Sequence, residues 1–127
     1  MPGAPQIFDA ALLVSTAIFS PSCLRAISIV EREAQRLPGV NLGLHRYGGI
    51  GFFFRGKEMS HIHGNGLLDC FVGRKKRDLL LRESDRVTAH HVFPQSGWIS
   101  FFVQKPEDVE RALELIKIAC AYRGSAE

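Results

Sequence analysis

Residues 56–72 read GKEMSHIHGNGLLDCFV, with two glycines and an asparagine at the centre of the segment. Both residue types tolerate the positive φ of tight hairpin turns, so Gly64-Asn65-Gly66 predicts a turn between two antiparallel strands. The first strand is expected over Lys57–His63 and the second over Leu67–Val72. This hairpin makes an antiparallel sheet the framework of the fold.

Periodicity and turn residues place the other elements around this hairpin. Ser20-Pro21 predicts a helix start, with an N-cap followed by proline at the first helical position. Helices are expected at about 21–37, 74–83 and from 106 onward, and further strands at 40–47, 51–55, 88–93 and 98–104. Because Gly56 alone separates 51–55 from the first hairpin strand, Lys57–His63, the segment 51–63 is interpreted as one or two strands.

The resulting order is α-β-β-β-α-β-β-α. Frequent hairpin turns without βαβ alternation predict an α+β two-layer sandwich, with an antiparallel sheet of about five strands and helices on one face. The same order resembles the secretion-chaperone-like and YjbR-like folds. Those folds host dissimilar roles, so the resemblance of order does not select a function.

Composition predicts one soluble domain over residues 1–127. Hydrophobic residues make up 46% of the chain and charged residues 23%, which is typical of globular proteins. Residues 1–19 are expected to form a loose arm and a short apolar segment. That segment is shorter than the roughly 20 residues of a membrane span and lacks a basic start. Three separated cysteines without a C-x-x-C pattern favour reduced thiols and a cytoplasmic location.

The first strand of the hairpin carries the candidate site. Because side chains alternate along a strand, His61 and His63 are expected on one face beside Met59, with Glu58 on the other. Two adjacent imidazoles need ligands, hydrogen bonds or water. A second pair, His90 and His91, precedes the turn before Trp98, so a folded sheet is able to bring the two pairs together.

Three motifs of this chain resemble the luciferase-domain family. They are the segments 45–49 (HRYGG), 56–64 (GKEMSHIHG) and 90–98 (HHVFPQSGW), and the resemblance covers about 39–122. The family takes its name from fungal luciferase, which oxidises a hydroxylated α-pyrone with molecular oxygen and without a known metal or organic cofactor. The resemblance therefore implies cofactor-independent oxygenation. Light emission is not inherited from it, because this chain is much shorter.

The resemblance also implies site residues. His61, His63 and His91 match the family pattern and are the expected catalytic residues, while fungal luciferase carries a histidine where this chain has Asp69. A histidine titrates near neutral pH and is able to remove an enol or phenol proton. The expected ligand is a small aromatic or enolic molecule, contacted by the following residues: His45, Arg46, Glu58, His90 and Trp98.

Two alternatives stay open. In the first, His61 and His63 bind a metal ion with His91 as third ligand, as a His-x-His on a strand commonly does. In the second, the histidines are structural, and the domain is a non-catalytic interaction module that forms a homodimer through the apolar N-terminal segment. The basic run Arg74–Arg77 lacks interleaved aromatic residues, which argues against nucleic acid as the partner.

Overall fold

The computed structural model describes residues 20–44, 48–90 and 92–125. Its elements follow in the order α2 (Pro21–Ala34), β1 (Val40–Leu44), β2 (Ile50–Phe54), β3 (Lys57–Ile62), β4 (Leu67–Phe71), α3 (Arg74–Glu83), β5 (Val87–Ala89), β6 (Trp98–Phe102), the 3-10 turn η1 (Pro106–Asp108) and α4 (Val109–Ser125). The α+β class is confirmed. The expected apolar segment and dimer surface within residues 1–19 lie outside the described residues.

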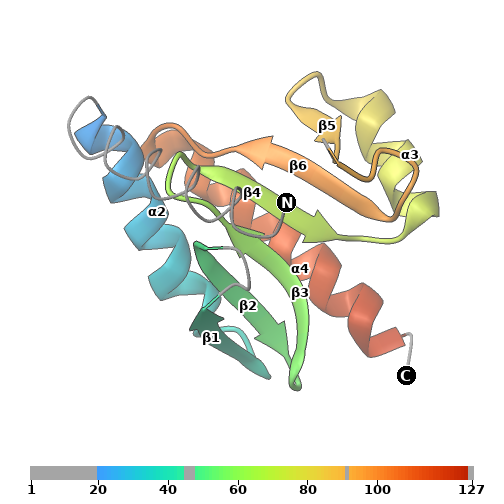
Figure 1. Cartoon of the computed structure of the whole chain (residues 1–127), viewed down its shortest axis with the longest axis horizontal. Helices are drawn as coiled ribbons and strands as arrows, with labels where there is room; N and C mark the ends of the chain where they lie inside the picture. Colours follow the sequence, from blue (N-terminus) through green and yellow to red (C-terminus); the bar gives the residue numbers. More distant parts are fainter. Residues whose placement is uncertain (1–19, 45–47, 91, 126–127) are drawn as a thin grey trace.

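The strands form one antiparallel sheet in the order β1-β2-β3-β4-β6-β5 (Figure 1). In the described part of the chain this sheet has six strands, where the sequence predicts about five. The difference lies at Arg55 and Gly56, which both adopt positive φ, 50° and 85°. Such a pair makes a tight two-residue hairpin turn, so β2 and β3 are separate, paired strands.

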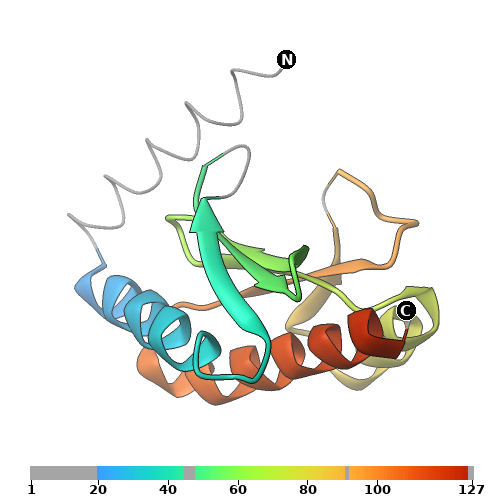
Figure 2. The same ribbon diagram turned by 90° about the horizontal axis from the view of Figure 1, so that it is seen from below.

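Two long helices cover one face of this sheet. Figure 2 shows α2 (blue) and α4 (red) side by side beneath the sheet, and in Figure 1 α4 passes behind the strands. α2 begins as predicted, because the Cys23 N–H donates to the Ser20 hydroxyl oxygen at 3.3 Å and Pro21 follows the cap. Between helices and sheet lies the core, which includes Val30, Phe52, Met59, Leu68, Ile99, Phe101, Leu115 and Ile116.

The basic run divides into exposed and buried positions. The side chains of residues 74–76 are exposed, whereas Arg77 is buried. The Arg77 guanidinium donates to the backbone carbonyls of Pro94 and Ser96, at 3.2 and 2.7 Å, and pairs with Asp78 at 2.8 Å. Arg77 therefore fastens α3 to the turn before β6 rather than presenting a charge to a partner.

Within residues 20–44, 48–90 and 92–125, no helix has both the length and the apolar character needed to cross a bilayer.

Candidate functional site

A β-bulge in β3 decides which side chains face the site. The pairing of β2 with β3 shifts by one residue between Phe52 and Phe53, and Met59 is the extra residue. Because a bulge interrupts alternation, Glu58 joins His61 on one face, with 3.5 Å between Glu58 Oε1 and His61 Nδ1. The prediction of opposite faces for these two residues is wrong. Met59 is fully buried in the core instead.

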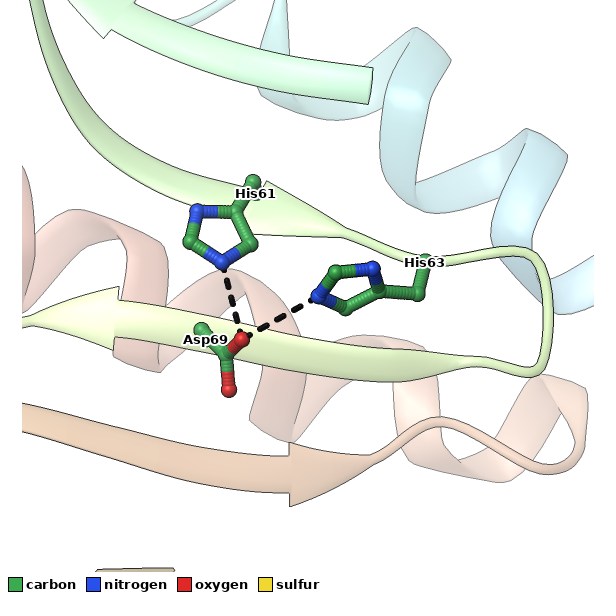
Figure 3. A group of neighbouring side chains, drawn as sticks. All are labelled: His61, His63 and Asp69. Atoms are coloured by element: carbon green, nitrogen blue, oxygen red, sulfur yellow. Dashed lines mark hydrogen bonds and ion pairs between the residues drawn. The ribbon is translucent and has the colours of Figure 1, made fainter. Parts of the chain in front are cut away.

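Imidazole nitrogens gather around one carboxylate oxygen at the middle of the sheet. Asp69 in β4 lies opposite His61 in β3, and its Oδ2 is 2.8 Å from His61 Nε2 and 3.3 Å from His63 Nε2 (Figure 3). His90 Nε2 approaches the same oxygen to 3.6 Å. The Ser100 hydroxyl in β6 donates to the other oxygen, Oδ1, at 2.5 Å. We call His61, His63, His90 and Asp69 the histidine–aspartate cluster.

The buried carboxylate and its neighbours shift each other's ionisation. Burial raises the pKa of Asp69, but hydrogen bonds from His61, His63 and His90 outweigh it and hold that pKa far below its ordinary value. Burial alone lowers the pKa of His61, while hydrogen bonds and the charges of Asp69 and Glu58 raise it to about 9. At neutral pH, His61 and Asp69 therefore form an imidazolium–carboxylate pair.

His90 is held in one tautomer by its own loop. The backbone N–H groups of Val92 and Phe93 both donate to His90 Nδ1, each at 3.1 Å. A nitrogen that accepts these bonds carries no proton, so the neutral ring has its proton on Nε2. That N–H faces Asp69 Oδ2. The ring also stacks on Phe93, with centroids 5.5 Å apart. His90 thus turns an N–H toward Asp69 at 3.6 Å and links the loop to the cluster.

Trp98 forms an apolar wall beside the cluster. Its indole ring lies 5.2 Å from the His61 ring and 6.2 Å from the His90 ring, measured between centroids. Phe71 continues this wall at 5.2 Å from Trp98. The indole is half-buried. A flat apolar surface next to polar nitrogens suits a planar molecule that carries an acidic group.

The structure brings together five of the side chains that the sequence singles out: Glu58, His61, His63, His90 and Trp98. His45, Arg46 and His91 lie outside the described residues, so their expected roles stay predictions. Sequence reasoning did not place Asp69 and Ser100 in the site. Their signal is the alternation of β4 and β6, which puts Leu68 and Ile99 in the core and turns these two residues to the other face.

The chemistry open to this arrangement is of two kinds. A histidine oriented by a buried carboxylate is able to take a proton from a bound molecule. The second kind is metal binding, because the ligand atoms of His61, His63 and Asp69 all lie within 4.8 Å of one another. Histidine nitrogen and carboxylate oxygen are ordinary ligands of divalent transition metals.

Comparison with known proteins identifies the family of this chain. No curated protein and no solved structure matches the chain at a significant level. The family model described as the luciferase domain matches residues 56–119, which is 64 of the 127 residues. The matched region contains the whole histidine–aspartate cluster together with Trp98 and Ser100. The chain belongs to the luciferase-domain family.

Proposed function

We propose that this chain binds a small, planar, acidic molecule, aromatic or enolic, alongside Trp98 and the histidine–aspartate cluster. One observation carries the proposal: the indole ring lies 5.2 Å from an imidazole that is itself paired with a buried carboxylate. An aromatic face and fixed polar groups then meet on one side of the sheet. Such a combination recognises a flat molecule by stacking and its acidic group by hydrogen bonding.

His63 is the residue best placed to accept the proton of the bound molecule. Its side chain is 18% exposed, against 9% for His61 and for His90. His61 is occupied between two carboxylates, and His90 is fixed by its loop. Asp69 orients the His63 ring through Nε2, which is the arrangement that general-base histidines use.

Cofactor-independent oxygenation is the reaction that family membership suggests for such a site. The substrate gives a proton to histidine, from O–H in its enol form or from C–H in its keto form. The resulting anion is electron-rich at carbon. That carbon forms a bond to dioxygen, which is reduced to a carbon-bound peroxide. The proton returns to the peroxide, so the product is a hydroperoxide of the substrate. The reaction then needs oxygen as its second substrate.

Trp98 fluorescence tests binding, because it is the single tryptophan of the chain. We suggest 4-hydroxy-6-methyl-2-pyrone as the probe and its 4-methoxy analogue as the control that has no acidic hydroxyl. Saturable quenching by the hydroxyl compound is expected, with at least about tenfold weaker binding for the methoxy compound and for His63→Ala, because each loses one charge-assisted hydrogen bond. Lys75→Gln, on the exposed start of α3, is the matched control and keeps full affinity.

The outcomes distinguish ligand binding, oxygenation and a purely structural role of the histidines. Quenching that does not saturate, or that is equal for the two pyrones, overturns the binding proposal and favours a structural role for the histidines. An oxygen electrode tests the reaction itself. Oxygen consumption with the hydroxyl probe, lost in His63→Ala, supports oxygenation, and binding without oxygen consumption restricts the function to binding.

A further inference from the structure

We propose that His61, His63 and Asp69 hold one divalent first-row transition-metal ion. The inference shares its site with the proposed function, but it needs no organic ligand and is measured without one. It also replaces the third ligand expected from the sequence, His91, with a carboxylate from the neighbouring strand.

The spacing of the donor atoms fits one shared ion. With metal–ligand bonds of 2.0–2.1 Å, neighbouring donors lie about 3.3–3.4 Å apart around a tetrahedral ion and about 2.8–3.0 Å apart around an octahedral one. Asp69 Oδ2 is 2.8 Å from His61 Nε2 and 3.3 Å from His63 Nε2. The longest separation within the triad is no more than 4.8 Å. To bring the most distant donor atoms within reach of one ion, the His63 side chain has to rotate. His63 comes directly after the last residue of β3.

Two further side chains orient the ligands as supporting residues do in metal sites. The Ser100 hydroxyl binds Asp69 Oδ1 at 2.5 Å, which turns Oδ2 toward the imidazoles. Glu58 Oε1 lies 3.5 Å from His61 Nδ1, the nitrogen that does not face the ion. A carboxylate behind a ligating histidine is the usual arrangement, because it fixes the ring and raises the basicity of the ligand nitrogen.

His90 is excluded from the ligand set although its ring lies in the same cluster. Its Nδ1 accepts two backbone N–H groups, so its Nε2 carries a proton and donates toward Asp69. A nitrogen that carries a proton has no lone pair for a metal ion. This distinction between His63 and His90 gives the inference a matched control.

Charge and ligand type indicate which ions fit. Two neutral imidazoles and one carboxylate leave a divalent ion with open positions, and Glu58 supplies a second negative charge nearby. Two histidines and one carboxylate are the ligand set of non-haem iron(II) oxygenases and of several zinc hydrolases. In metal-loaded protein the ion, rather than proton transfer to His63, would stabilise the anion of the bound molecule.

Cobalt(II) binding to the full-length chain, purified without a histidine tag and stripped by chelator, tests the inference. Calorimetry is expected to give one ion per chain, and visible d–d absorption reports the coordination. Near-ultraviolet thiolate-to-metal charge transfer should be absent, since Cys23, Cys70 and Cys120 are not in the proposed site. Zinc(II) should displace the cobalt with the same stoichiometry.

Four variants identify the ligands. His63→Ala and Asp69→Asn are expected to lower cobalt affinity by more than about 100-fold, and Glu58→Gln by about 10–100-fold because it acts on His61 from behind. His90→Asn keeps an acceptor for the loop but removes the donor that faces Asp69, so it is expected to lower cobalt affinity by about tenfold, well short of the loss in His63→Ala. Circular dichroism checks the fold of each variant. His63→Ala is decisive, because its side chain is partly exposed and lies beyond the strand.

The inference is overturned if wild-type protein gives no saturable cobalt signal, or if His63→Ala binds cobalt like wild type. It is also overturned if His90→Asn, while remaining folded, loses as much cobalt affinity as His63→Ala. The pyrone titration, run in chelator, keeps the two proposals apart. Cobalt binding without pyrone binding leaves only the metal site standing, and pyrone binding without cobalt binding leaves only the proposed function.

Discussion

Gly51 in β2 leaves the space that the carboxylate of Glu58 occupies: a Cβ at position 51 would lie 2.6 Å from Glu58 Oε2. Gly51 also lies directly opposite His61. The glycine therefore makes room for the second carboxylate beside His61. Together with the bulge in β3, it lets one imidazole lie between two acidic groups.

Gly51→Ala is expected to push Glu58 away from His61 while the fold persists. The added methyl group also meets Phe53 Cε1 at 2.9 Å, so overpacking should cost about 1–3 kcal/mol of stability. In chelator, the pKa of His61 should fall below about 9 and remain above its ordinary value, because Asp69 is still paired with it. NMR titration of the imidazole measures this pKa.

The double variant Gly51→Ala with Glu58→Gln is the control for this effect. If the glycine acts through Glu58, the double variant has the same His61 pKa as Glu58→Gln alone. An unchanged His61 pKa in Gly51→Ala would show that the Glu58 carboxylate still reaches the His61 ring when the methyl group is present.

Asp69→Asn is expected to destabilise the metal-free protein by about 3–5 kcal/mol, because it removes the nearer of the two carboxylates beside a buried imidazolium. The pH dependence has a definite sign. The pKa of Asp69 is lowered by folding, so its contribution is lost as pH falls below its ordinary value of 3.8. The pKa of His61 is raised, so its contribution is full below 6.5 and is lost as pH rises toward about 9.

Urea unfolding of wild type and Asp69→Asn at a series of pH values checks this window. The difference in unfolding free energy should be largest between about pH 4 and 6.5 and should shrink on both sides. Ser100→Ala, which removes only one hydrogen bond to the same carboxylate, should cost about 1–3 kcal/mol. If the difference in unfolding free energy between wild type and Asp69→Asn does not change with pH, the His61–Asp69 ion pair is contradicted.

Arg77→Gln should lower stability by about 1.5–3 kcal/mol, because a charged donor to two backbone carbonyls is lost. Lys76→Gln, exposed in the same basic run, should stay within about 0.5 kcal/mol of wild type. Hydrogen exchange should report faster opening of the turn at 94–97 in Arg77→Gln alone. Equal effects of the two substitutions would mean that Arg77 does not hold the turn.

Asp108→Asn should weaken the start of the last helix. Its carboxylate accepts from Arg86 at 2.7 Å and from the N–H groups of Gln104 and Lys105. The Arg86 hydrogen bond and charge lower the pKa of Asp108, so its stabilisation exists above pH 3.8 and is lost as pH falls below that value. Thermal unfolding should show a loss of about 1.5–3 kcal/mol at pH 7. The loss should shrink in acid, and the exposed neighbour Glu107→Gln should show neither effect.

Local patterns in the sequence predict much of the fold. Ser20-Pro21 starts α2, Gly64-Asn65-Gly66 joins β3 to β4, and the basic run opens α3 at Arg74 as expected. Each of these features depends on a few neighbouring residues whose backbone preferences agree. The sequence leaves the separation of β2 from β3 open, because Arg55 adopts a positive φ that is uncommon for arginine.

For a similar reason, the sequence predicts only part of the candidate site. Histidine pairs stand out as residue types, so the sequence singles out His61, His63 and His90. The bulge at Met59 depends on how β3 pairs with β2, and no local pattern marks it. In the sequence, Asp69 stands out only as a departure from the family pattern. Its place in the site depends on the strand register, which puts it opposite His61.

Asp69 also joins parts of the chain that are made at different times. It binds His61, eight residues earlier, and Ser100, thirty-one residues later. A nascent chain that ends within the loop before β6 is able to form the β3–β4 hairpin, but its carboxylate lacks the serine. Since pairing between distant segments forms slowly, we expect the histidine–aspartate cluster to be completed late in biosynthesis and to mark the completely folded protein.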